Sequence, residues 1–152
     1  FDLLRAVISA NEQQFERIVT KAERLLEGDL AGQNIALLGL TFKAHTDDLR
    51  NSPAIEVAHR LAKKGAILRA YDPMVNSTSD IPNEIEIATT IENAVNQADL
   101  AVVLTEWPEF ASANWPVLAD LMKSPRVVDA RNLLDRDAMI ELGFRYDDLG
   151  RT

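Results

Sequence analysis

Two cations stand at either side of a polar loop, and their chemistry suits a diphosphate. Lys43 and Arg50 lie between an apolar run that ends at Leu40 and a helical pattern that opens at Ser52. Lysine offers a point charge and arginine a planar fork of N–H donors, which are the two forms of cation that complement phosphate oxygens. Unpaired backbone N–H groups at the start of a helix also attract anions. The sequence therefore predicts an anion site between a strand and a helix.

Three further polar residues, Thr46, Asp47 and Asp48, lie between the two cations. The paired aspartates could orient Arg50 or contact a ribose. The alternative is a solvated acidic turn, which is the commoner role of two adjacent aspartates. We expect all three residues to support the site.

A carboxylate, Asp72, follows the next apolar run along the chain. Nucleotide-binding sheets often keep a carboxylate at this place to accept hydrogen bonds from ribose hydroxyls. The alternative is an ordinary Asp-Pro turn. The glycine spacing of a dinucleotide-binding turn is missing, because Leu40, Thr41 and Phe42 follow Gly39. We therefore expect side chains, more than backbone, to hold any nucleotide.

Glu106, Trp107 and Arg131 follow two later runs. Arg131 could close on a base or a phosphate from the far side of the site, or it could pair with Asp129 or Asp135. Trp107 could stack on a base, although packing is the commoner role of such a residue. We expect Glu106 and Trp107 to support the site that Arg131 completes.

Short β-rich runs alternate with helical patterns from residue 34 onward, which is typical of a parallel sheet covered on both faces. We predict an α/β fold, a Rossmann-like doubly wound parallel sheet of about six strands, preceded by one long helix. Ligands bind beyond the carboxyl ends of the strands of such a sheet, where the polar residues named above would converge. Strands are predicted at residues 35–40, 67–71, 85–87, 100–104, 127–129 and 144–146. Helices are predicted at 53–64 with Ser52 as cap, from a capping box at 89–92 to about 98, at 116–123 and at 135–142.

The opening helix is predicted over residues 2–27, which contain no Gly or Pro and carry apolar residues at helical spacing. Gly28 marks its end. The chain would thus divide into a helix with its linker, residues 1–30, and a Rossmann-like α/β domain, residues 31–152. The helix is expected to pack on another domain or another copy of the chain, and packing on its own sheet is the equal alternative.

Composition excludes several classes of function. The 152 residues are 47% hydrophobic and carry a formal net charge of -8, so the global field repels nucleic acids and anionic membranes. No run is long enough to span a bilayer and no targeting segment is visible, which predicts a cytoplasmic protein. The absence of Cys excludes a cysteine nucleophile, and His45 and His59 are too few for a metal site. Because the chain starts at Phe1, we expect it to be a piece of a longer protein.

The string from Gly39 to Pro53 resembles the C-terminal domain of the UDP-glucose/GDP-mannose dehydrogenase family. Further matches follow in the expected order: Tyr71-Asp72-Pro73, Thr105-Glu106-Trp107, Asp129-Ala130-Arg131-Asn132 and Gly150-Arg151. The opening helix, with Asn11, is similar to the family's central helix, which links two Rossmann-like domains and builds the dimer.

This resemblance implies an NAD-dependent enzyme that oxidises the C6 alcohol of a nucleotide-sugar to a carboxylate through a covalent intermediate on a cysteine. UDP-glucose is the expected substrate, with UDP-N-acetylhexosamine or GDP-mannose as alternatives. Lys43 would contact the nucleotide-sugar, Arg131 its nucleotide end or a neighbouring subunit's substrate, and Arg50 the NAD phosphates. Since the NAD fingerprint and the cysteine are absent, the resemblance implies an inactive chain that binds substrate and forms a homodimer through its first helix.

Two other functions are compatible with parts of the sequence. The chain could be a non-catalytic assembly module whose first helix is the functional element. It could also be a signalling receiver, with Asp47 and Asp48 as the acidic pair and Thr105 as the switch residue. The receiver is disfavoured, because the fifth strand ends in Asp129 where a receiver carries a lysine.

Overall fold

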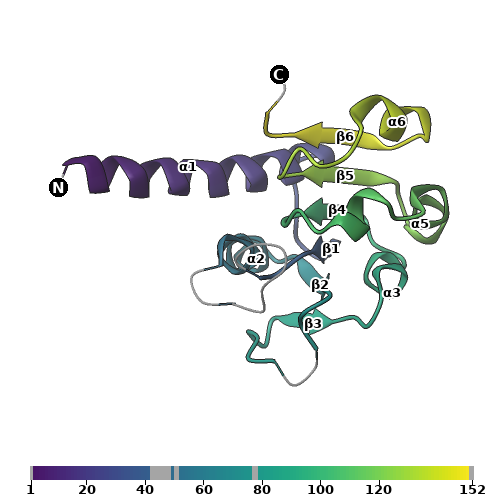
Figure 1. Cartoon of the computed structure of the whole chain (residues 1–152), viewed down its shortest axis with the longest axis horizontal. Coiled ribbons are helices and arrows are strands. Elements are labelled where there is room, and N and C mark those ends of the chain that lie inside the picture. The colour runs from purple at the N-terminus through teal and green to yellow at the C-terminus, as the bar shows by residue number, and fades with distance from the viewer. Residues whose placement is uncertain (1, 42–48, 50–51, 77–78, 151–152) are drawn as a thin grey trace.

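A single sheet of six parallel strands forms the centre of the protein, which we describe from a computed structural model over residues 2–41, 49, 52–76 and 79–150 (Figure 1). The strand order is β3-β2-β1-β4-β5-β6, so the direction of winding reverses between β1 and β4. This confirms the predicted doubly wound α/β fold. The strands are β1 (Asn34–Leu38), β2 (Ile67–Tyr71), β3 (Ile85–Ile87), β4 (Leu100–Val103), β5 (Arg126–Asp129) and β6 (Arg145–Asp148).

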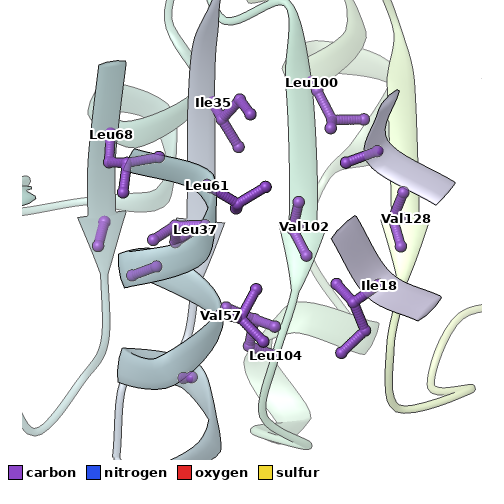
Figure 2. Packing of buried hydrophobic residues seen from close by; sticks show 14 of the residues in the cluster. Ile18, Ile35, Leu37, Val57, Leu61, Leu68, Leu100, Val102, Leu104 and Val128 are labelled. Carbon is purple, nitrogen blue, oxygen red and sulfur yellow. The ribbon is translucent and has the colours of Figure 1, made fainter. Parts of the chain in front are cut away.

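Helices cover both faces of the sheet (Figure 1). The first face carries α1 (Asp2–Leu25) and α2 (Pro53–Lys63), and the second carries α3 (Ile91–Val95), α4 (Pro108–Ala111), α5 (Trp115–Leu121) and α6 (Arg136–Glu141). Successive side chains of a strand point to opposite faces. Ile35 and Leu37 of β1 therefore join the core under α1 and α2, whereas Ala36 and Leu38 join the core under the other helices. Figure 2 shows the first of these two cores.

The two halves of the long helix α1 differ in burial. Its C-terminal half packs on the sheet, because Ile18, Val19, Ala22 and Leu25 are buried in the first core. Its N-terminal half extends beyond the sheet (Figure 1) and exposes its large apolar side chains, Leu3, Leu4, Val7 and Ile8. The helix thus folds back on its own sheet in one half and leaves its apolar stripe uncovered in the other. The predicted boundary at residue 30 separates the two segments in sequence, yet their buried residues share one core.

Several predicted bounds were wrong. Strand β1 ends at Leu38, two residues early, because Gly39 adopts a φ of 101° and turns the chain. Strand β6 begins at Arg145 and runs to Asp148, later than predicted. Helix α4 was not among the predicted helices: Pro108 at its first turn has the φ that a helix requires, so the proline begins the helix.

Two predicted caps also differ in detail. Helix α3 is capped one residue later than the capping box indicated, because Thr90 Oγ1 accepts from the Asn93 N–H at 3.0 Å. Ser52 stands at the N-cap of α2, but its side chain does not cap that helix. Instead, Ser52 Oγ donates to the carbonyl oxygen of Leu40 at 2.6 Å. Ser52 therefore brings the start of α2 to the chain that leaves β1.

Candidate functional site

The turn after β1 closes directly against the end of β4. The Gly39 N–H donates to the Tyr71 carbonyl at 2.8 Å, and a Cβ at Gly39 would lie 1.9 Å from Thr105 Oγ1. Thr105 is only 2% exposed, and Oγ1 has no hydrogen-bond partner in the part of the chain that the structure describes. The Thr105 side chain thus leaves no room for a Cβ at Gly39, so the turn after β1 requires glycine at this position.

Asp72 holds the chain after β1 in place. Its Oδ2 accepts from the N–H groups of Leu40 at 2.8 Å and Thr41 at 3.1 Å, and from Trp107 Nε1 at 3.3 Å. Its Oδ1 accepts from the Met74 N–H at 2.9 Å. The carboxylate is 1% exposed and does not face solvent. Asp72 therefore acts on the site through the backbone that it positions.

Trp107 lies in the second core, as the packing interpretation predicted. Its ring is buried, and its indole N–H donates to Asp72 Oδ2. Trp115, at the start of α5, donates from its indole N–H to the Phe110 carbonyl at 2.9 Å, and its ring packs edge-on against Phe144. Both tryptophans therefore pack inside the protein, in the second core.

Arg131 lies in a turn that buried polar groups hold at the end of β5. Asp129 Oδ1 accepts from the Arg131 N–H at 3.2 Å, and Oδ2 accepts from the Leu134 N–H at 2.7 Å and the Tyr146 hydroxyl at 3.0 Å. Asn132, with a φ of 53°, accepts through Oδ1 from the N–H groups of residues 149 and 150. Burial, and then the negative charge of Asp129, raise the pKa of Tyr146 above its usual range. The hydrogen bonds of Asp129 and Asn132 therefore hold the turn that carries Arg131.

The guanidinium of Arg131 pairs with Glu106, not with Asp129 or Asp135 as one interpretation of the sequence had it. Nη2 of Arg131 lies 2.5 Å from Oε2 of Glu106, and their side chains are 45% and 41% exposed. Asp129 reaches only the backbone of Arg131. Glu106 and Arg131 follow neighbouring strands, so the predicted convergence at one edge of the sheet is confirmed for this pair. Both side chains are partly exposed, although the contacting Oε2 of Glu106 is itself buried and makes no hydrogen bond in the described part of the chain. The rest of the Arg131 guanidinium is therefore accessible to an anion.

A groove of about 520 Å³ runs between α1, the start of α2 and the ends of β4 and β5. This volume is in the range of small-molecule sites, and the lining is mostly apolar with few polar groups, as such sites are. The lining residues are Asn11, Gln14, Phe15, Ile18, Pro53, Ala54, Val57, Leu104, Ala130, Arg131 and Leu149. The groove therefore lies between Arg131 and the first turn of α2, whose backbone N–H groups receive no hydrogen bond from the Ser52 side chain.

Five of the predicted site residues lie outside the described residues: Lys43, Thr46, Asp47, Asp48 and Arg50. Their roles stay predictions. The described chain on either side, Thr41 and Ser52, is tied to Asp72 and Leu40 at the carboxyl ends of the strands.

The described part of the chain contains no group of three or more potential ligands that could hold a metal ion. His59, on α2, pairs with Glu84 at the surface. Within the same part, no helix is long and apolar enough to cross a membrane.

Residues 36–136 match the profile of the UDP-glucose/GDP-mannose dehydrogenase family, UDP binding domain. The chain belongs to this family. The resemblance inferred from the ordered motifs is thereby confirmed.

Relatives of this dehydrogenase family agree with the assignment. The chain is 42% identical over 151 residues to a UDP-glucose 6-dehydrogenase of Rickettsia felis, covering 97% of this chain and 34% of that protein. A UDP-glucose dehydrogenase from Pyrobaculum islandicum superposes with a TM-score of 0.77 at 27% identity, over 94% of this chain and 31% of that one. A UDP-D-ManNAc dehydrogenase from Pyrococcus horikoshii gives 0.73 at 31% identity, over 90% and 30%. The chain spans about a third of the length of these relatives.

Sequence reasoning missed the wall of the groove that α1 supplies. Asn11, Gln14 and Phe15 come from the opening helix, which was expected to pack on another domain, another copy of the chain or its own sheet, and not to line a site. A signal was present, because the two amides interrupt a stripe of apolar residues on that helix. The partner of Arg131 had no such signal, because Glu106 is distant in the sequence and only the sheet brings the two together.

Proposed function

We propose that this chain is the nucleotide-sugar-binding portion of an NAD-dependent nucleotide-sugar 6-dehydrogenase, with UDP-glucose as the substrate. The observation that carries the proposal is the half-exposed guanidinium of Arg131 at the rim of a 520 Å³ groove beyond the carboxyl ends of β4 and β5. The names of the relatives support UDP-glucose. UDP-N-acetylhexosamine and GDP-mannose are the alternatives, because a UDP-D-ManNAc dehydrogenase shares the fold.

In this proposal the chain binds and orients the substrate, and the chemistry lies elsewhere. Arg131 neutralises phosphate charge, while Lys43 contacts the nucleotide-sugar from the loop after β1. With no cysteine in the sequence, the chain forms no covalent intermediate of its own and is inactive alone. Since the glycine spacing of a dinucleotide-binding turn is missing after Gly39, the turn after β1 does not match the usual site of the NAD pyrophosphate. NAD, which accepts hydride when bound, would be held mainly outside this chain, with Arg50 contacting its phosphates.

Calorimetry with UDP, UDP-glucose and GDP-mannose tests the proposal. We expect weak binding, tightest for the UDP ligands, and a loss of about tenfold in affinity for Arg131→Ala, which removes a charge-assisted contact. Arg136→Ala is the matched control, because Arg136 begins α6, away from the groove. The proposal fails if no nucleotide binds, or if both arginine variants bind like the parent chain.

We also propose that the N-terminal half of α1 forms a homodimer contact. Four apolar side chains there are at least half exposed: Leu3, Leu4, Val7 and Ile8. Removing residues 1–27 would also remove the buried half of α1, so the sharper test is substitution of Leu4 and Ile8 by Glu. In analytical ultracentrifugation we expect the parent chain to be dimeric and the variant monomeric, whereas Val117→Glu on α5 stays dimeric. A monomeric parent chain would refute the contact.

The remaining expectations from the charge balance, a cytoplasmic location and no nucleic-acid or membrane partner, stay predictions.

A further inference from the structure

Two amides interrupt the apolar stripe of α1 at the place where the helix leaves the sheet. Asn11 and Gln14 follow Val7 and precede Ile18 at helical spacing, so they share one face of the helix with these apolar residues. Both amides line the groove beneath Arg131. Both side chains are exposed, so their amide groups are open to a ligand that enters the groove.

These amides have unused hydrogen-bonding capacity. Gln14 Oε1 accepts from Arg17 Nη1 at 3.1 Å, and the Gln14 NH₂ group makes no hydrogen bond to a described residue. Asn11 makes none in the described chain, although an amide can donate two hydrogen bonds and accept two. Donors and acceptors of both amides are therefore available on the groove side of α1.

The floor of the groove favours a flat heterocycle over a sugar. Phe15, which is partly exposed, and the more deeply buried Ile18 and Leu104 contribute only apolar side-chain atoms. A hexose carries several hydroxyls, and burying them without partners costs free energy. A nucleobase has two apolar faces and one edge of donors and acceptors, which the amides of Asn and Gln can pair in bidentate fashion. The lining therefore matches a base.

The wall that carries the amides is already held in position. Arg60 of α2 contacts Glu12 and Glu16 of α1, and its guanidinium lies 5.2 Å from the centre of the Phe15 ring. On the other side, Arg17 Nη2 donates to the Leu149 carbonyl at 3.1 Å. A preorganised wall lowers the ordering cost of binding.

We propose that Asn11 and Gln14 bind the edge of the nucleobase of the nucleotide-sugar whose phosphates contact Arg131. This inference rests on the proposed function and adds to it a base subsite on the opening helix. The apolar floor would accommodate the faces of the base, and the amides would select ligands that carry one.

A comparison of UDP with inorganic pyrophosphate isolates the base contact, because pyrophosphate needs only the cations. Calorimetry is done on the parent chain and on the double variant Asn11→Leu with Gln14→Leu, which keeps helix propensity. Two lost hydrogen bonds predict an affinity for UDP about tenfold lower, with pyrophosphate binding unchanged. Gln13→Leu is the control, because Gln13 lies on the same helix but lines a different hollow, beside Arg17 and Lys21. It should bind both ligands like the parent.

Each result is decisive. If the double variant binds UDP like the parent chain while Arg131→Ala weakens it, the base subsite is wrong and the proposed function stands. If the double variant loses UDP and pyrophosphate equally, the amides do not read a base, and the subsite is again refuted. If the parent chain binds neither ligand, the proposed function fails and the subsite with it.

Discussion

Gly39 and Gly28 have nearly the same backbone conformation but different surroundings, with φ values of 101° and 99°. No atom lies within 4 Å of a Cβ built on Gly28, whereas a Cβ on Gly39 would overlap the Thr105 side chain. Gly28→Ala should therefore cost only the backbone strain, about 1 kcal/mol. Gly39→Ala should cost about 3 kcal/mol, because overpacking adds to the strain. Urea unfolding measures both, and equal losses would contradict the close approach of β1 and β4.

Glu106 competes with anions for Arg131, since the two side chains form a half-exposed ion pair. Glu106→Gln removes the negative charge and keeps the shape. We expect it to raise the affinity for UDP about threefold, which corresponds to an exposed ion pair of modest strength. The gain should shrink at high salt, because screening already weakens the pair in the parent chain. Calorimetry at two salt concentrations checks this, and a loss of affinity would instead assign Glu106 a direct contact with the ligand.

At the scale of elements, Arg60 is the main link between α1 and α2. It contacts Glu56 of its own helix, Glu12 and Glu16 of α1, and the face of the Phe15 ring. Lys64 links the same two helices through Glu23 alone, at 3.0 Å, with both side chains partly exposed. These two residues form a natural pair for comparison.

Arg60→Met should therefore destabilise the fold by about 1–2 kcal/mol, because a cation–π contact and a network of three carboxylates are lost together. Lys64→Met should cost about 0.5 kcal/mol or less, the usual value of one exposed ion pair. Thermal or urea unfolding measures both. If Arg60→Met costs no more than Lys64→Met, the position of α1 depends on its buried stripe and not on the ion pairs.

The order of the elements could be read from the sequence, and their ends could not. Alternation of β-rich runs with helical patterns predicted all six strands. In β1, β4 and β5, burial on both faces leaves a near-continuous apolar run, whereas β3 and β6 are less buried. Helix α4 was missed because four residues carry too little periodicity to be recognised, and Pro108 was taken as a loop residue. Ser52 is the N-cap residue of α2 as predicted, but its Oγ donates to the Leu40 carbonyl and does not cap the helix. This tertiary contact could not be predicted from a local pattern.

At the scale of the whole molecule, stability should fall at alkaline pH. Burial, then the hydrogen bond to Glu109, raises the pKa of Tyr71 to about 12. Burial and Asp129 raise that of Tyr146 further. Above pH 10 the unfolded chain releases these protons while the folded chain keeps them, so the stabilisation is complete below pH 10 and is lost as the pH rises past it.

Unfolding free energies measured from pH 8 to pH 11.5 test this expectation. The slope above pH 10 should be shallower in Tyr146→Phe, although that variant is less stable at every pH because Asp129 loses a donor. Tyr71→Phe should show a smaller change of slope, because Tyr71 is shifted less. Since lysines titrate in the same range, only the difference between parent and variant is interpreted. Equal slopes in all three chains would refute the role of the buried hydroxyls.

The sequence by itself determined the class of fold, the number of strands, the family and the edge of the sheet at which polar residues gather. These follow from periodicity and from motifs that are contiguous along the chain. Only the tertiary structure decided that Asp72 is buried beneath the turn, that Arg131 pairs with Glu106, and that the opening helix supplies one wall of the groove. Each of these depends on contacts between segments far apart in the chain, and such contacts arise only when the sheet and its helices pack together.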